Sequence, residues 1–94
     1  MQADLSAAET AYREKARQDG FSDPVEKMVE ADRFNAVHTH EETLFLFIQA
    51  GQLTVDKADG QVVGTPGKTI TVAAGLDHTE RAGPEGAMIL VSRR

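Results

Sequence analysis

From Val25 onward, short segments rich in Val, Thr, Ile and Phe are separated by Gly, Pro and Asp-Gly. Apolar segments of this length, bounded by turn residues, are typical of β-strands. We expect strands at residues 25–34, 36–41, 43–49, 51–57, 61–65, 68–73, 77–82 and 87–92. Turns are predicted at Asp59-Gly60, Thr65-Pro66-Gly67, Ala74-Gly75 and Gly83-Pro84-Glu85-Gly86. The pattern predicts an all-β fold, a small antiparallel barrel or sandwich, in residues 21–94.

The first twenty residues have a different pattern, dominated by Ala, Glu, Lys and Arg, which are good helix formers. Ser6 and Glu9 have the spacing of a capping box, and Gly20 is typical of a helix end. We therefore predict one α-helix within residues 1–20, belonging to the same single domain as the barrel. Its apolar positions recur at helical spacing but form only a weak stripe, made of Leu5, Ala8, Tyr12 and Ala16.

The segment "LFLFI", residues 44–48, is apolar on both faces. A barrel strand needs only its inward face apolar, so Phe45 and Phe47 require a cover on the other face. Either the N-terminal helix or a second subunit could provide that cover, and the sequence favours neither. The second alternative is the basis for expecting a homodimer.

Composition excludes several classes of function. The chain has 94 residues, a formal net charge of -5 and no cysteine, so thiolate metal sites and cysteine nucleophiles are absent. An acidic chain without a basic cluster is not expected to bind nucleic acid. The longest strongly apolar run is too short to span a bilayer, and the first twenty residues lack the apolar core of a signal peptide. We expect a cytoplasmic protein that does not bind membranes.

The stretch "HTHEET", residues 38–43, contains two of the three histidines in the chain. Side chains alternate along a strand, so His38 and His40 should share a face with their Cβ atoms roughly 7 Å apart. Two imidazoles at that spacing can bind one metal ion. The third histidine, His78, follows a glycine turn. A barrel could bring it beside the other two, because neighbouring strands place distant residues on one wall. Taken alone, a His-x-His pair on an edge strand is more often an exposed surface feature.

The three histidines also carry a resemblance to the cupin superfamily. Cupins have a first motif, G(X)5HXH(X)3–4E(X)6G, in which His38, His40 and Gly51 have counterparts. In the second motif, G(X)5PXG(X)2H(X)3N, the matching residues are Gly67, Gly75 and His78. The resemblance implies a small antiparallel barrel of jelly-roll type, with all three histidines at metal-ligand positions.

The sequence departs from these motifs at several positions. Asp32, Ala73 and Ala82 replace a glycine, a proline and an asparagine, and Leu44 stands where the glutamate ligand belongs. Glu42 could supply the missing carboxylate, because it would lie on the His40 face if the strand continues. Glu80, two residues after His78, is the second candidate for the same reason.

The expected site therefore comprises His38, His40, His78 and Glu42. It would bind one divalent transition metal ion, Fe, Ni, Zn, Mn or Cu, because imidazole suits such ions better than magnesium or calcium. By resemblance, the function would be that of a metal-dependent enzyme, a dioxygenase or an isomerase, acting on a small molecule inside the barrel. The alternative is a non-catalytic cupin that binds or senses a small ligand. The expected apolar lining consists of Leu44, Leu46, Ile48, Ile70 and Val72.

Overall fold

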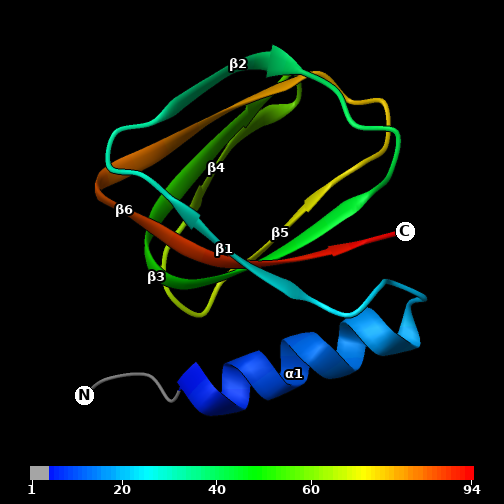
Figure 1. The fold of residues 1–94 in the computed structure, drawn as a ribbon. Coiled ribbons are helices and arrows are strands. Elements are labelled where there is room, and N and C mark those ends of the chain that lie inside the picture. Colours follow the sequence, from blue (N-terminus) through cyan, green and yellow to red (C-terminus); the bar gives the residue numbers. More distant parts are fainter. Residues whose placement is uncertain (1–4) are drawn as a thin grey trace.

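Figure 1 shows the computed structural model, which describes residues 5–94. In this part of the chain, one helix precedes six strands. The elements are α1 (Leu5–Gln18), β1 (Val25–Val29), β2 (Phe34–His38), β3 (Leu44–Lys57), β4 (Gly60–Gly64), β5 (Thr69–Val72) and β6 (His78–Arg93). The predicted fold class is confirmed: the strands pair antiparallel throughout and curve into a small barrel.

The two long strands, β3 and β6, each belong to both layers of the barrel. In one layer the first half of β3 lies between β5 and the second half of β6, and β1 completes the edge. In the other layer the second half of β3 lies between β4 and the first half of β6, and β2 completes the edge. The layers are therefore continuous through β3 and β6, which bend from one into the other.

Because of these bends, four of the predicted strands form only two strands in the structure. The segments predicted at 43–49 and 51–57 are one strand, and so are those at 77–82 and 87–92. Residues 83–86, predicted as a turn, form an irregular bulge opposite Gln52 inside β6. Gly51 and Gly86 have φ angles of 75° and 78°, and a Cβ on Gly51 would lie 2.1 Å from the Gly86 carbonyl oxygen. Glycine at these positions lets the two paired strands approach each other closely and bend without ending.

The first two strands are also shorter than predicted. β1 ends at Val29, and a turn closed by the Arg33 N–H to the Glu30 carbonyl precedes β2. Asp32 has a φ of 58° in this turn, a left-handed conformation that aspartate tolerates better than most residues. β2 then ends at His38, so His40 lies in the connection to β3 and not on the predicted strand.

The main hydrophobic core fills the space between the two layers. The five residues expected to line the barrel all belong to it and are at most 4% exposed. Burying an aliphatic side chain of this size contributes roughly 1.5–3 kcal/mol each. The core comprises Val29, Leu44, Leu46, Ile48, Leu53, Val55, Ile70, Val72, Ala82, Ala87, Ile89 and Val91.

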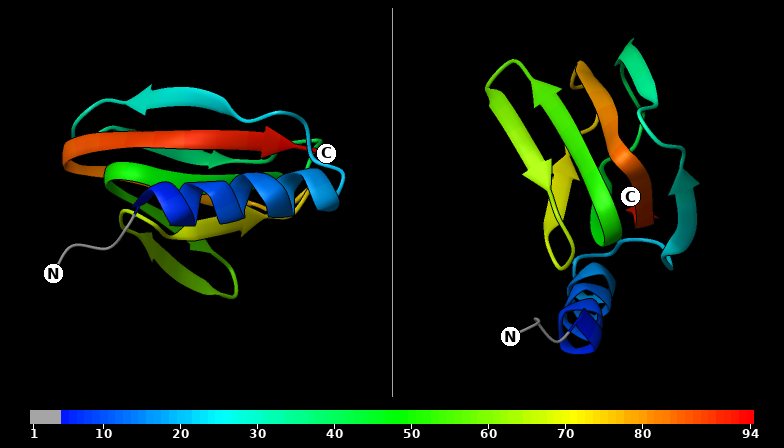
Figure 2. Two further views of the ribbon diagram at one scale, coloured as in Figure 1. Left: turned by 90° about the horizontal axis from the view of Figure 1, so that it is seen from below. Right: turned by 90° about the vertical axis from the view of Figure 1, so that its left-hand side faces the viewer.

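Helix α1 lies outside the barrel and covers the second face of β3 (Figure 2). The Tyr12 ring is 4.6 Å from Phe45 and 5.4 Å from Phe47, measured between centroids, and all three rings are buried. Its hydroxyl donates to the Phe45 carbonyl oxygen at 2.6 Å. Since the chain's own helix covers this face, the observation behind the expected homodimer no longer requires a second subunit. Dimer formation stays a prediction.

The helix ends where the sequence predicted. Gly20 has a φ of 80°, and the amides of Gly20 and Phe21 bond back to the carbonyls of Arg17 and Ala16. This is the Schellman pattern of a glycine-terminated helix. The predicted cap at Ser6 is wrong, because Ser6 lies inside the helix; residues 1–4 of the predicted helical segment lie outside the described residues. Between residues 5 and 94, no helix is long and apolar enough to cross a membrane.

Candidate metal centre

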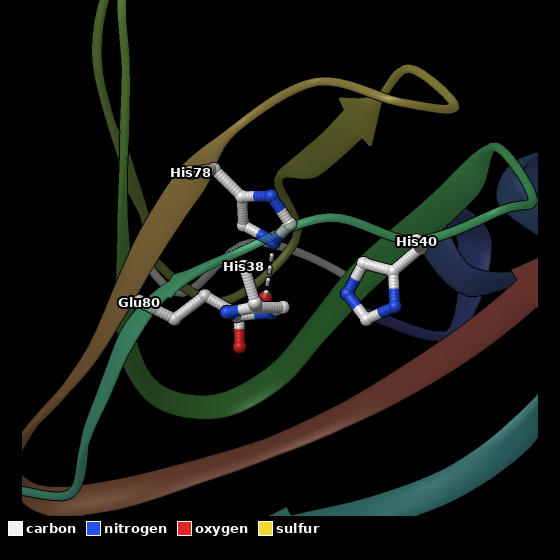
Figure 3. A group of neighbouring side chains, drawn as sticks. All are labelled: His38, His40, His78 and Glu80. Atoms are coloured by element: carbon white, nitrogen blue, oxygen red, sulfur yellow. Dashed lines mark hydrogen bonds and ion pairs between the residues drawn. The ribbon is translucent and has the colours of Figure 1, made fainter.

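Four side chains meet at one end of the barrel (Figure 3). Within residues 5–94, His38, His40, His78 and Glu80 each offer a ligand atom, and these atoms lie within 4.8 Å of one another. His78 is buried, and the other three are half-buried. The structure thus brings together the three histidines that the sequence singled out.

A β-bulge turns the side chains of β2 toward this point. In the β2–β6 ladder, Asn35 stands opposite Glu80 and His38 stands opposite His78, with a register shift between the two pairs. The shift inserts one extra residue in β2, so Asn35 and His38 both face inward while Ala36 and Val37 are exposed. A bulge is a common device for aiming a side chain into a site.

His40 reaches the group from the connection between β2 and β3. Its backbone carbonyl accepts a hydrogen bond from Gly75 N–H at 2.9 Å, and Thr43 Oγ1 accepts one from Ala74 N–H at 3.2 Å. These two hydrogen bonds join the β2–β3 connection to the turn that precedes His78. The His40 ring centroid lies 4.8 Å from His38 and 5.2 Å from His78. The two histidines of "HTH" therefore converge as predicted, although by loop geometry and not by strand alternation.

Backbone carbonyls fix which imidazole nitrogens are free to bind a metal. His38 Nδ1 lies 2.7 Å from the Ala36 carbonyl oxygen, and His78 Nδ1 lies 3.1 Å from that of Leu76. A carbonyl can only accept, so each Nδ1 carries the proton in a neutral ring. The lone pair of each ring is then on Nε2, which is the arrangement expected of metal-binding histidines.

The third imidazole has a buried nitrogen that lacks a hydrogen-bond partner. His40 Nε2 is inaccessible to solvent and contacts no donor or acceptor among the described residues. Burial, together with the nearby His38 and His78, lowers the pKa of His40 below its usual value near 6.5. The lowered pKa favours the neutral ring, which is the form that metal ligation requires. Since buried polar atoms are nearly always satisfied, this nitrogen is available to a ligand.

Glu80 adds a carboxylate to the three imidazoles. Its Oε2 lies 3.2 Å from His78 Nε2, and its Oε1 accepts a hydrogen bond from Asn35 Nδ2 at 3.0 Å. If His78 Nδ1–H donates to Leu76, Nε2 presents a lone pair to a carboxylate oxygen. That contact is favourable only when a proton or a metal cation lies between the two atoms.

Glu42 does not join this group. It is exposed on the bend that follows His40, and its carboxylate is not among the four converging ligand atoms. Leu44, at the position of the motif glutamate, is buried in the core. Of the two candidates for the missing carboxylate, the structure brings Glu80 to the histidines. Sequence reasoning missed Asn35. Its inward orientation depends on the bulge in β2, and a bulge has no reliable local sequence signature.

Comparisons with solved structures identify the fold of this chain. The chain matches no protein-family model and no curated protein. Among solved structures, an RmlC-like cupin from Shewanella frigidimarina NCIMB 400 matches 74% of this chain and 62% of its own, with a TM-score of 0.65 and 20% identity. The fold is that of a cupin. A cupin-2 domain protein from the same organism matches 85% of this chain and 91% of its own, with a TM-score of 0.62 and 16% identity.

A third neighbour has an activity in its name. The DMSP lyase DddQ from Ruegeria pomeroyi DSS-3 matches 73% of this cupin-fold chain and 36% of its own, with a TM-score of 0.66 and 23% identity. The chain thus spans less than two thirds of the lyase and of the RmlC-like cupin. At these identities the likeness establishes the fold, and the chemistry must be argued from the site.

The donor set fits a divalent transition metal ion. Three imidazoles and a carboxylate suit zinc, iron, nickel, manganese or copper. Opposite ligands on a metal sphere of about 2.1 Å radius are about 4.2 Å apart. The observed span of up to 4.8 Å is close to this value, so small side-chain movements would bring the four atoms onto one ion. The group could therefore hold a metal.

Proposed function

We propose that this cupin binds one divalent transition metal ion through His38, His40, His78 and Glu80, and that it is a metal-dependent enzyme acting on a small molecule. A dioxygenase or an isomerase is the proposed reaction class. The carboxylate comes from β6 in place of the position after the "HTH" pair. Such an ion would act as a Lewis acid or support redox chemistry, depending on the metal.

One observation carries the proposal. Two imidazoles have Nδ1 tied to carbonyl oxygens, the third has a buried Nε2 without a partner among the described residues, and a carboxylate stands beside them. Polar atoms arranged only for stability would be paired with one another. Here the buried His40 Nε2 is left unpaired in a group that also contains a carboxylate, which is favourable when a cation binds there.

The surroundings of the four side chains favour a catalytic site over a closed structural one. Four protein ligands leave coordination positions open on an ion that takes five or six. His38, His40 and Glu80 are half-buried at this end of the barrel, and Val55 of the apolar core stands opposite Glu80 in the β3–β6 ladder. Apolar walls exclude water on one side, while His78 and Glu80 stay fixed by β6. A small substrate at this end would be oriented by the half-buried histidine edges.

The experiment is metal analysis followed by turnover assays. The chain is stripped with a chelator, reloaded with Fe²⁺, Mn²⁺, Co²⁺, Ni²⁺, Cu²⁺ or Zn²⁺, and analysed for metal per chain. We expect one ion per chain in the wild type and almost none in a His38→Ala/His40→Ala double variant. The loaded protein is then screened against small organic acids and sugars, with dioxygen uptake recorded. Uptake coupled to incorporation of both oxygen atoms into product supports a dioxygenase, and a product with the molecular formula of its substrate, formed without uptake, supports an isomerase.

Two outcomes would overturn the proposal. Absence of stoichiometric metal in the wild type would show that the histidines are polar lining. Stoichiometric metal with saturable ligand binding, but without turnover of any ligand that binds, would favour the sensor alternative.

A further inference from the structure

Asn35 is the residue that links β2 to the candidate metal ligands. It is half-buried on the inner side of the bulge and stands directly opposite Glu80 in the ladder. Its amide nitrogen donates to Glu80 Oε1 at 3.0 Å. Asn35 itself is not one of the four converging ligand residues.

Arg33 fixes the orientation of this amide. Arg33 Nε donates to Asn35 Oδ1 at 3.1 Å, and a guanidinium group has only donors. The amide oxygen must therefore face Arg33, and the amide NH₂ must face Glu80. The chain of bonds from Arg33 through Asn35 to Glu80 has one consistent direction.

The two carboxylate oxygens of Glu80 therefore make different contacts. Oε1 is occupied by the Asn35 donor, while Oε2 faces His78 Nε2 at 3.2 Å. Without the Asn35 donor, the carboxylate could rotate and present both oxygens to an ion. A second carboxylate oxygen would then take a coordination position that is otherwise open to water or substrate.

We infer that Asn35 is a positioning residue that holds Glu80 as a one-oxygen ligand and keeps a coordination position free. The inference rests on the proposed function, since it assumes that Glu80 contacts a metal ion. Outer hydrogen bonds to metal ligands typically change metal affinity by about 10–100-fold when removed. The effect of Asn35 should therefore be seen both in affinity and in the coordination number of the ion.

The test uses Co²⁺ as the probe, because its visible absorption responds to coordination number and geometry. Asn35→Asp keeps the shape of the side chain but replaces the donor with an acceptor facing Glu80. Asn35→Ala removes the donor without adding charge, and serves if the Asp variant does not fold. Val37→Thr, on the exposed face of the same strand, is the matched control. Each protein is titrated with Co²⁺ in full-length form, and the thermal midpoint of the metal-free protein is measured separately.

We expect the Co²⁺ affinity to fall by about tenfold or more in Asn35→Ala, in which Glu80 loses its orienting donor. The loss should be smaller in Asn35→Asp, because the added negative charge also attracts the cation. At saturating Co²⁺, both spectra should differ from the wild-type spectrum, and Val37→Thr should match the wild type in both respects. A purely structural role for Asn35 would lower the thermal midpoint and leave the saturated spectrum unchanged, which would overturn the inference. Unchanged affinity and spectrum in both variants would overturn it too. If the wild type itself fails to bind Co²⁺, the proposed function fails first.

Discussion

Two groups of three rings lie in this small protein, and they differ in how their polar atoms are satisfied. Under the helix, Tyr12 packs against two phenylalanines with centroids 4.6 and 5.4 Å away. At the barrel end, the three imidazole centroids lie 4.3–5.2 Å apart. The spacing is similar, but the Tyr12 hydroxyl bonds both the Phe45 carbonyl and Ser92 Oγ, whereas His40 Nε2 has no partner among residues 5–94.

This difference separates the side chains that stabilise the fold from those available for binding. A buried group whose polar atoms are all paired contributes stability and has nothing left to offer a ligand. A buried group with an unpaired nitrogen loses stability in the free protein and regains it when a ligand binds. We therefore expect substitutions under the helix to change folding stability, and substitutions at the histidines to change metal affinity.

The largest effect should come from Phe47→Ala. The ring is 1% exposed between the helix and β3, and deleting a buried phenylalanine side chain costs roughly 3–5 kcal/mol of folding free energy. Chemical denaturation of the metal-free protein measures this loss. Phe34→Ala is the matched control, because Phe34 is 50% exposed and should cost no more than about 1 kcal/mol. Equal losses in the two variants would mean that the helix does not cover Phe47 in solution.

His78→Ala should have the converse effect. Removing one of the converging ligands should lower metal affinity at least tenfold, which corresponds to about 1.4 kcal/mol or more. The metal-free protein should remain folded but lose some stability, because His78 is 2% exposed and its truncation leaves a cavity. Competition with a chromophoric chelator gives the affinity, with folded Phe34→Ala protein as the comparison. Wild-type affinity in His78→Ala would remove His78 from the site.

Tyr12→Phe tests the satisfied polar atom under the helix. The hydroxyl donates to the Phe45 carbonyl at 2.6 Å and lies 3.0 Å from Ser92 Oγ, so its loss should cost about 1 kcal/mol. Metal affinity should not change. Pairing the variant with Ser92→Ala in a double-mutant cycle isolates the contribution of the second contact. Additive losses would indicate that the two hydroxyls do not interact.

A pH dependence should distinguish the histidine end from the helix side. Because the pKa of His40 is lowered mainly by burial, the unfolded chain gains a proton on this ring at a higher pH than the folded chain does. The stability associated with the neutral ring is therefore complete above about pH 6.5 and decreases as the pH falls toward the lower folded-state pKa. Metal binding should weaken in the same direction, because protonated imidazole cannot ligate.

The measurement is denaturation of the chelator-treated protein between about pH 8 and pH 5, where an ordinary imidazole titrates. Wild type should lose more stability on acidification than His40→Gln, in which the titrating group is gone. The difference between the two curves isolates His40 from the other ionisable groups. Parallel curves would show that the ring is not held neutral in the folded protein.

The sequence predicted the strands and the histidine group better than the way they are connected. Short segments rich in Val, Thr, Ile and Phe locate most strands, because the Gly, Pro and Asp-Gly residues between them favour turns. Gly51 and residues 83–86 were interpreted as strand ends, yet glycine permits a bend within a paired strand as readily as a turn. Only pairing with a distant strand decides between the two, and that information is not local.

The carboxylate ligand was the least predictable part of the site for a related reason. Alternation along an unbroken strand favoured Glu42, but β2 ends at His38 and the chain bends before Glu42. Glu80 faces inward because β6 continues straight from His78 and is held opposite Asn35 by the bulge in β2. A bulge has no reliable local signature, so neither Asn35 nor the choice of Glu80 could be derived from residue order.

The smallest effect should follow from Glu42→Gln. The side chain is exposed on the bend after His40, so neutralising it should change metal affinity by no more than about 0.5 kcal/mol. Glu80→Gln makes the same chemical change in a side chain that is 14% exposed and contacts His78, and should lower affinity at least about tenfold. Titrating both variants with the same metal compares two carboxylates that differ only in location. A large loss in Glu42→Gln with wild-type affinity in Glu80→Gln would place the fourth ligand on the bend, where the sequence first suggested it.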